Sequence, residues 1–220
     1  MKRKLSRGKT LSTEIIKTDK ENWMAPFAEH LGVIPPEFEN WRQVFASKGS
    51  RIVLVEGNLD REYIEFLRET FPQEFQLPLD VEVVPYGGKG ALGNTLMMKF
   101  ILSRIASYFV TFDQDAAQEV TKSLEKIGLV ANKNFAAVGQ SKIGRQAIEG
   151  LLPDRVLRAV HGRETDLMMV LGAGNSDDRK QAKSSLKRIL LTEFKSHQDY
   201  SKEELAPLFQ LGKVISKPFL

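Results

Sequence analysis

The chain has 220 residues, of which 42% are hydrophobic and 27% are charged. This composition is typical of a soluble globular protein and unlike that of a disordered chain. The chain has no cysteine, which excludes disulfides and thiolate metal sites and agrees with a reducing compartment, so we expect a cytoplasmic protein. No apolar run reaches the ~20 residues that a membrane helix needs, and we therefore expect no membrane partner.

The net charge of +4 is concentrated at the start of the chain. The first 20 residues contain seven Lys or Arg and two acidic residues, and the remainder is close to neutral. We predict a basic tail or linker over residues 1–22, which is either solvated or an arm that contacts phosphate. Residues 23–50 predict a helical lead-in, in which Trp23 and Trp41 pack against the main domain.

From residue 51 onward, strand-like runs alternate with helix-like runs. The strand-like runs are RIVLVEG, LDVEVVPY, YFVTFDQD and NFAAVG. The helix-like runs that follow them are LDREYIEFLRETF, LGNTLMMKFILSRIA, AAQEVTKSLEKIGL and GRQAIEGLLP, the last of which is stopped by Pro153. This alternation predicts an α/β fold with a central parallel sheet covered by helices on both faces.

The last part of the chain is predicted to be helical. DDRKQAKSSLKRILLTEFKSH reads as one long helix and SKEELAPLFQLG as another. We therefore divide the main body into a core at 51–160 and a helical C-terminal part at 161–220. The methionine pairs in LMMKF and DLMMVLG occupy apolar positions and are expected to fill the core.

Acidic residues follow two of the predicted strands. Glu56 ends the first strand, Asp60 lies on the first turn of the next helix, and Asp113 and Asp115 end the third strand. Ligands of open α/β sheets bind outside the carboxyl ends of the strands, so we expect these carboxylates to converge. Helix capping would explain Asp60 and Asp115 singly but not Glu56. A hard divalent cation, which prefers oxygen ligands, would explain the group.

The two acidic motifs carry a resemblance to a known domain. VLVEGNLD followed later by VTFDQD resembles the TOPRIM domain of topoisomerases, bacterial primases and several nucleases, over about residues 50–150. Within that superfamily the chain is most similar to the C-terminal nuclease domain of the OLD (overcoming lysogenization defect) family. That family adds a glycine-rich loop, here PYGGKG, and a further helical acid, which QAIEGLLP offers as Glu149. The resemblance implies a Rossmann-like TOPRIM sheet.

The resemblance also implies an activity, namely a metal-dependent DNA endonuclease or nickase. One or two Mg²⁺ or Mn²⁺ ions would clamp the oxygens of a phosphodiester, and a lysine on a late helix would stabilise developing charge. RKQAKSSLKRIL offers Lys183 or Lys187 for that lysine, and we prefer Lys183. The metal ligands implied by the resemblance are Glu56, Asp60, Asp113, Asp115 and Glu149.

The glycine-rich loop is expected to lie against the ions or the nucleic acid. Gly57, Gly87, Gly88 and Gly90 would keep the backbone close, because a Cβ would intrude. Lys89 contacts a backbone phosphate or is a solvated loop lysine. We therefore assign Gly88, Lys89 and Gly90 to nucleic-acid binding.

OLD-family members usually carry an ATPase domain ahead of the nuclease domain. This chain has no GxxxxGK[ST] loop, because the Gly-Lys of GGKGALGN is followed by glycine. We expect either a fragment or a stand-alone nuclease domain. The expected partners are DNA and an ATPase domain on the same chain or on a partner chain.

Other readings of the motifs remain open. GKGALG satisfies GxGxxG, and Asp113 follows it at the spacing of a ribose-binding acid, which would suit a dinucleotide site. However, Pro85 and Tyr86 loosen the tight turn, and Glu56 would stay unexplained. A non-catalytic TOPRIM module that binds metal or nucleic acid is the main alternative. A dehalogenase-type phosphatase, a topoisomerase and a primase are each less favoured by the motif context.

Overall fold

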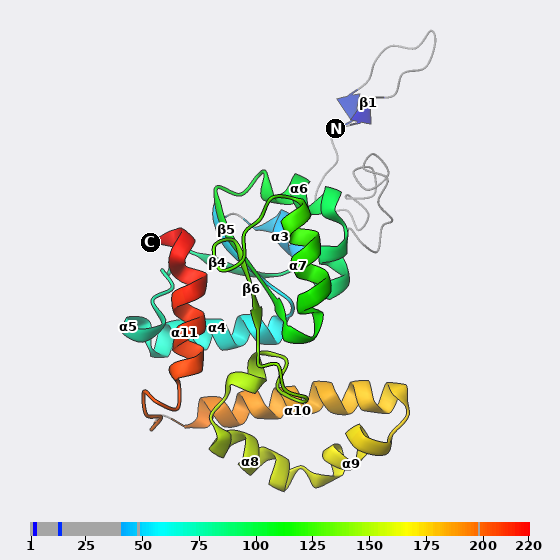
Figure 1. The fold of residues 1–220 in the computed structure, drawn as a ribbon, viewed down its shortest axis with the longest axis vertical. Coiled ribbons are helices and arrows are strands. Elements are labelled where there is room, and N and C mark those ends of the chain that lie inside the picture. Colours follow the sequence, from blue (N-terminus) through cyan, green and yellow to red (C-terminus); the bar gives the residue numbers. More distant parts are fainter. Residues whose placement is uncertain (1, 4–12, 15–40, 48, 198) are drawn as a thin grey trace.

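The computed structural model describes residues 2–3, 13–14, 41–47, 49–197 and 199–220 (Figure 1). Apart from residues 2–3 and 13–14, the predicted basic tail lies outside the described residues, as does most of the predicted lead-in with Trp23. Within the tail region, β1 (Lys2–Arg3) pairs antiparallel with β2 (Thr13–Glu14). No helix in the described ranges is long and apolar enough to cross a membrane.

The central element is a four-stranded sheet in which every pairing is parallel. It is built from β3 (Arg51–Val55), β4 (Glu82–Pro85), β5 (Ser107–Asp113) and β6 (Phe135–Val138), in the spatial order β4-β3-β5-β6. The α/β class and the parallel sheet predicted from the alternating pattern are therefore confirmed. Because the strands are parallel, their carboxyl ends lie at one edge of the sheet.

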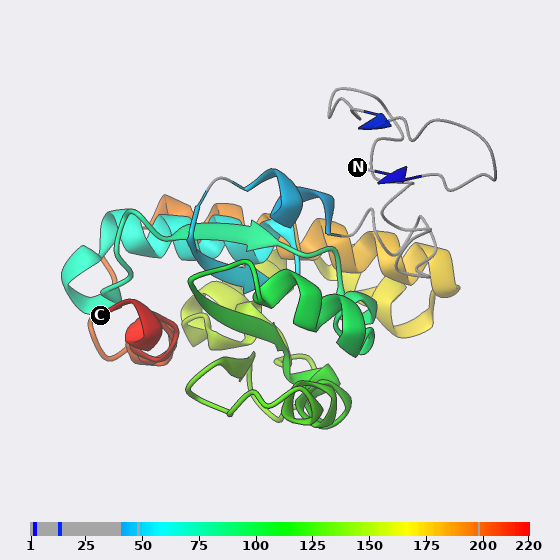
Figure 2. The same cartoon turned by 90° about the horizontal axis from the view of Figure 1, so that it is seen from above.

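Helices cover both faces of this sheet (Figures 1 and 2). The side chains of β3 alternate between two buried clusters, with Val53 and Val55 in one and Ile52 and Leu54 in the other. This alternation follows from the period of two residues along a strand. Nearly continuous apolar runs are therefore required for strands buried on both faces.

The helices predicted after the first three strands are present in the predicted order. The first face carries α4 (Asn58–Thr70), α5 (Pro72–Phe75) and α11 (Ala206–Ser216). Buried residues of α8 (Asp154–Arg163) and α10 (Ser176–Ser196) join the same core cluster from beyond one end of the strands (Figure 1). The second face is covered by α3 (Arg42–Ala46), α6 (Thr95–Leu102) and α7 (Ala117–Lys126). Trp41, just before α3, is buried and stacks on Tyr86 with ring centroids 5.7 Å apart, which confirms its predicted packing role.

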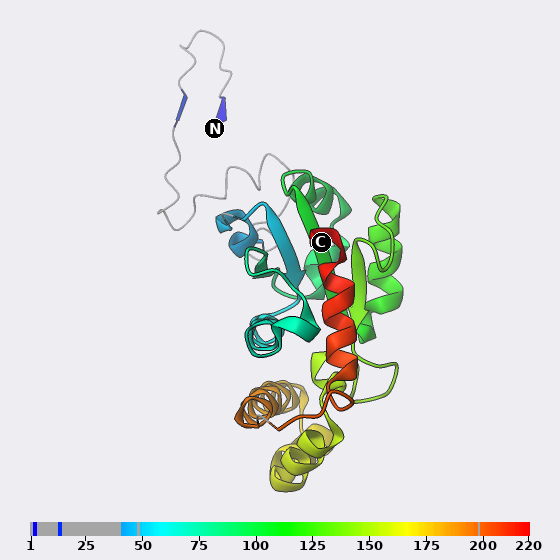
Figure 3. The same cartoon turned by 90° about the vertical axis from the view of Figure 1, so that its left-hand side faces the viewer.

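The C-terminal part shares its core with the sheet. Helix α10 contacts α4, α8 and α9 (Thr165–Ala173), and α8 and α10 gather beyond one end of the strands (Figure 3). The chain then returns to the sheet, where η4 (Lys217–Phe219) packs against β5 and the Ser107 hydroxyl donates to the Pro218 carbonyl at 2.8 Å. The predicted boundary at residue 160 falls inside α8.

The segment GRQAIEGLLP does not form the predicted helix. Only a short 3-10 turn, η3 (Ile148–Leu151), is present. The Gln146 carbonyl accepts from the Gln114 amide at 2.7 Å, so it is engaged by a distant backbone group. The Gly150 carbonyl likewise accepts from the Gln140 side chain at 3.0 Å. These long-range bonds compete with the i to i+4 pattern of a helix and hold the segment against the end of β5.

The two methionine pairs differ. Met97 and Met98 on α6 are buried, as predicted. Met168 and Met169 on α9 are 37% and 70% exposed, and α9 has no buried residue. The prediction of core filling was therefore wrong for the second pair, because α9 packs on α8 and α10 rather than on the sheet.

Candidate active site

Two of the predicted carboxylates meet at the carboxyl edge of the sheet. Glu56 follows β3, and Asp113 is the last residue of the neighbouring β5. The Asp113 amide donates a hydrogen bond to Glu56 Oε2 at 3.3 Å. Adjacent parallel strands thus bring together two residues that are 57 positions apart in the sequence.

Asp60 lies on the first turn of α4 and caps the N-terminus of this helix. Its Oδ2 accepts from the Gly57 amide at 2.8 Å, so the capping role considered for Asp60 is present. Asp60 also interacts electrostatically with the other site acids. Burial, followed by the charge of Glu149, raises its pKa to about 6.

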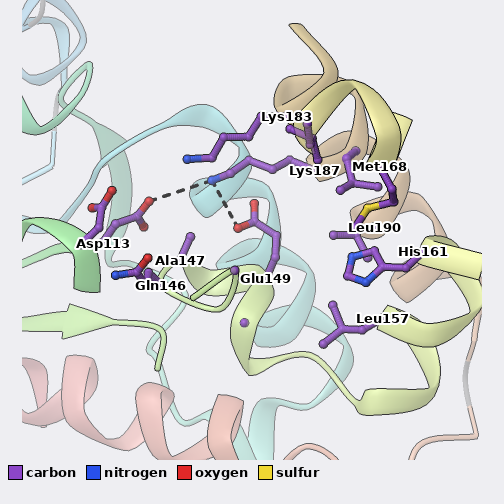
Figure 4. Close-up of a pocket in the computed structure, with 15 residues that line it drawn as sticks. Asp113, Gln146, Ala147, Glu149, Leu157, His161, Met168, Lys183, Lys187 and Leu190 are labelled. Carbon is purple, nitrogen blue, oxygen red and sulfur yellow. Dashed lines mark ion pairs between the residues drawn. The ribbon is translucent and has the colours of Figure 1, made fainter. Parts of the chain in front are cut away.

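Glu149 and Lys187 complete a partly buried charged cluster (Figure 4). Glu149, from η3, is 6% exposed, and its Oε2 lies 3.2 Å from Lys187 Nζ. The same ammonium group lies 4.0 Å from Asp113 Oδ2. The other carboxylate oxygen, Glu149 Oε1, is buried and has no hydrogen-bond partner among the described residues.

Burial and the closeness of like charges shift the pKa values of the groups in the cluster. Burial, then the charge of Asp60, raises the pKa of Asp113 to about 8, although Lys187 acts against this. Burial would lower the pKa of Lys187, but the charges of Glu149, Asp113 and Asp60 raise it overall. The lysine therefore stays protonated while the carboxyl groups compete for protons.

The remaining predicted residues lie around this cluster. Lys183 is exposed and lines the same cavity as Lys187, one helical turn earlier on α10, but only Lys187 has an ion pair with the site acids among the described residues. Lys187, the alternative to the preferred Lys183, is therefore the lysine that belongs to the charged cluster. Asp115 lies in η2 (Gln114–Ala116), is exposed, and also lines the cavity.

The glycine-rich loop is held beside Glu56 by its backbone. The Gly88 amide donates to the Glu56 carbonyl at 3.0 Å. Gly87 and Gly88 have φ of 84° and 105°, a left-handed conformation that favours glycine. A Cβ at Gly88 or Gly90 would meet no atom of the described chain within 4 Å. Backbone conformation, and not close packing within this chain, therefore accounts for Gly88.

The same loop lacks the arrangement of a dinucleotide turn. The 3-10 turn η1 (Lys89–Gly93) separates the glycine pair from α6. The Asn94 side chain accepts from the Met97 amide at 3.0 Å and so caps α6. A dinucleotide phosphate would need the free N–H groups of a helix that begins directly after the turn.

A cavity of about 310 Å³ opens beside the carboxylates. It extends from the charged cluster to the space between α8, α9 and α10. Its lining residues are Asp113, Asp115, Gly144, Gln146, Ala147, Glu149, Gly150, Leu157, His161, Met168, Leu171, Lys183, Leu186, Lys187 and Leu190.

Tyr63 is a site neighbour that the sequence did not single out as functional. It lies one turn after Asp60 on α4 and is fully buried, and its hydroxyl has no hydrogen-bond partner in the described ranges. Burial and the charges of Glu149 and Asp60 raise its pKa. In the sequence, only its spacing of three residues from Asp60 places Tyr63 near the site. A tyrosine with a purely structural role in the core would show the same spacing.

The cluster has the donor chemistry of a hard-cation site without being arranged as one. No group of three or more acidic or histidine side chains among the described residues is placed to hold an ion as it stands. Nevertheless, Glu56, Asp60, Asp113 and Glu149 offer only oxygen donors, and Glu149 Oε1 lacks a partner. Oxygen donors of this kind suit Mg²⁺ or Mn²⁺.

Comparison of the chain with protein-family models, with curated proteins and with solved structures finds no match.

Proposed function

We propose that this protein is a metal-dependent nuclease of the TOPRIM type that hydrolyses phosphodiester bonds in DNA. The observation that carries the proposal is the convergence of four carboxyl groups and one lysine from four separate segments at the carboxyl edge of a parallel sheet. Those residues are Glu56, Asp60, Asp113, Glu149 and Lys187.

Structural roles account for only part of this cluster. Capping explains Asp60, and pairing with Lys187 explains one oxygen of Glu149. Burying several carboxyl groups around one ammonium group still costs free energy. Burial and the neighbouring charge of Asp60 raise the pKa of Asp113 to about 8, which is the direction expected of a carboxyl group that is costly to ionise. Costs of this kind concentrate at functional sites.

Each residue of the cluster has a role in the proposed reaction. Glu56, Asp60, Asp113 and Glu149, with Asp115 at the cavity, would hold one or two Mg²⁺ or Mn²⁺ ions. The ions would supply positive charge to the phosphate oxygens and orient the attacking water. Water adds to phosphorus, one ester P–O bond breaks, and the leaving oxygen ends with a proton. Lys187, protonated and fixed by Glu149, stabilises negative charge on the reacting phosphate.

Two other functions are less favoured. A non-catalytic TOPRIM module would bind metal or nucleic acid through the same residues without turnover. A dinucleotide-binding domain would use the glycine loop, but the engaged start of α6 and the carboxylate cluster disfavour it. We also propose an ATPase domain, on this chain or a partner, as a source of regulation.

Cleavage of supercoiled plasmid DNA tests the proposal. We expect wild-type protein to nick or linearise the plasmid with Mg²⁺ or Mn²⁺, and Asp113→Ala and Lys187→Met to lose at least ~100-fold of this activity. Glu125→Gln, which changes an exposed acid on α7, is the matched control and should cut normally.

The alternatives have distinct outcomes in this assay. Cutting that survives Asp113→Ala would place the chemistry elsewhere. Folded protein that binds Mn²⁺ and DNA but never cuts would favour the non-catalytic module, or an activity that requires the ATPase domain. Addition of candidate ATPase partners separates these last two.

A further inference from the structure

We propose that the cavity beside the carboxylates receives a nucleobase that has been unstacked next to the phosphate to be cleaved. The substrate class is then single-stranded DNA, or duplex DNA opened at the cleavage point. This inference rests on the proposed nuclease function and goes beyond it, because metal-assisted hydrolysis of a backbone phosphate does not itself require a base pocket.

The cavity has two chemically different ends (Figure 4). Asp113, Glu149 and Lys187 lie at one end. The other end carries Leu157, Met168 and Leu190, with His161 among them (Figure 4), and Leu171 and Leu186 add further apolar lining to the cavity. A phosphate and its metal ions would use only the charged end. An occupant that uses both ends needs an anionic group joined directly to a flat or apolar group.

A nucleotide has that composition. A backbone phosphate at the carboxylate end leaves its base within reach of the apolar walls. The volume of about 310 Å³ falls at the lower end of small-molecule sites, which are ~300–1,000 Å³. Enzymes that bind a base out of the stack hold it between apolar or aromatic side chains in such a pocket.

Polar groups in the wall could contact the edge of the base. Gln146 and His161 both line the cavity. Burial and the charge of Arg145 lower the pKa of His161, which favours the neutral imidazole with one donor and one acceptor nitrogen. Donor and acceptor groups that can exchange roles suit a pocket that accepts more than one base.

The side of the cavity formed by α9 can adjust to occupants of different size. Met168 and Leu171 face the cavity from a helix that has no buried residue. Methionine is unbranched and flexible, so it can adjust to bases of different size. A wall of this kind predicts weak discrimination among the four bases.

A neighbouring loop offers a means of unstacking. Gly144 lines the cavity, and the preceding Ile143 is fully exposed, next to Lys142. Exposed apolar side chains of this type insert between base steps in proteins that kink or open DNA. Gly139 and Gly144, with φ of 109° and 77°, give the loop its tight shape.

Binding of two oligonucleotides of equal charge tests the inference without requiring cleavage. One probe is a fluorescent oligodeoxythymidine, and the other is the same length of abasic deoxyribose phosphate, both in Ca²⁺ and measured by anisotropy. We expect wild-type protein to bind the base-containing probe at least ~5-fold more tightly, since the base buries apolar surface against the leucine and methionine side chains of the cavity.

Neighbouring methionines provide a matched pair of variants. Met168→Trp fills the cavity from an exposed helix and should reduce binding of the base-containing probe to the level of the abasic probe. Met169→Trp, which is 70% exposed and does not line the cavity, should leave the preference intact. Leu171→Trp fills the same cavity from another position and should repeat the effect of Met168→Trp.

Each other outcome overturns the inference. Equal wild-type binding of the two probes, or an unchanged preference in both cavity-filling variants, would show that the cavity holds no base. The nuclease proposal would stand in either case, because it requires only backbone binding. Failure to bind either probe, together with no plasmid cleavage, would remove the proposed function and the inference with it.

Discussion

Buried polar groups are the features that matter most at the scale of single residues. Tyr63 and Glu149 each bury a polar oxygen that has no partner in the described structure. Glu149 belongs to the charged cluster, and Tyr63 interacts electrostatically with Glu149 and Asp60. Such groups cost free energy in the folded state unless something binds to them. These unpaired groups therefore lower the free energy of unfolding. Destabilising arrangements of this kind are common at functional sites.

Replacement of Tyr63 by phenylalanine should stabilise the protein. The variant removes a buried hydroxyl with no partner, so we expect the free energy of unfolding to rise by up to ~1 kcal/mol in urea denaturation. Tyr86→Phe is the matched control, because the Tyr86 hydroxyl donates to the Thr111 carbonyl at 2.9 Å. That variant should lose ~1 kcal/mol. A clear loss of stability in Tyr63→Phe would show that its hydroxyl is bonded.

At the scale of elements, the irregular segment between β6 and α8 decides where Glu149 lies. The segment contains only a 3-10 turn and no α-helix. At Gly150 the chain passes close to the backbone of Arg145. A Cβ at Gly150 would lie 2.1 Å from the Arg145 carbonyl oxygen. The geometry of the site therefore depends on a glycine that has no chemical role of its own.

Gly150→Ala should destabilise the protein and impair the site. The added methyl group must push backbone apart, and we expect a loss of ~1–3 kcal/mol, with plasmid cleavage reduced even where the variant is fully folded. Gly162→Ala on α8 is the control, since its Cβ would meet no described atom within 4 Å. An alanine there should stabilise the helix by ~0.5–1 kcal/mol. Equal behaviour of the two variants would contradict the packing argument.

For the molecule as a whole, the carboxyl cluster links stability to pH and to metal. In the absence of divalent cations, the pKa values of Asp60 and Asp113 are about 6 and about 8 in the folded protein, above the ordinary value of 3.8. The folded state then holds protons that the unfolded state has released. Stability therefore falls as pH rises between about 4 and 8.

Thermal unfolding in a chelator should show this dependence. We expect the Tm of wild-type protein to fall from pH 6 to pH 8, and Asp113→Asn to flatten the fall because its amide does not titrate. Millimolar Mn²⁺ should raise the Tm more at pH 8 than at pH 6, since protons compete with the cation. A wild-type Tm that rises with pH over this range, or an unchanged slope in Asp113→Asn, would contradict the assignment.

Local sequence was enough to predict much of the secondary structure. The four strands, α4, α7 and α10 were predictable because apolar periodicity reflects burial on each side of a strand or helix. The positions of Glu56 and Asp113 at the carboxyl edge followed from the parallel sheet alone. The short turn at Glu149 was not predictable, since the bonds that replace the helix come from residues distant in the sequence.

Tertiary structure decided which residues lie together. Lys183 and Lys187 lie on the same side of α10, and only the packing of α10 beyond the sheet brings Lys187 to Glu149 and Asp113. The exposure of α9 and the cavity with two unlike ends were equally invisible in the sequence. Local patterns report whether a residue is buried, whereas the identity of its neighbours depends on how distant segments are placed against one another.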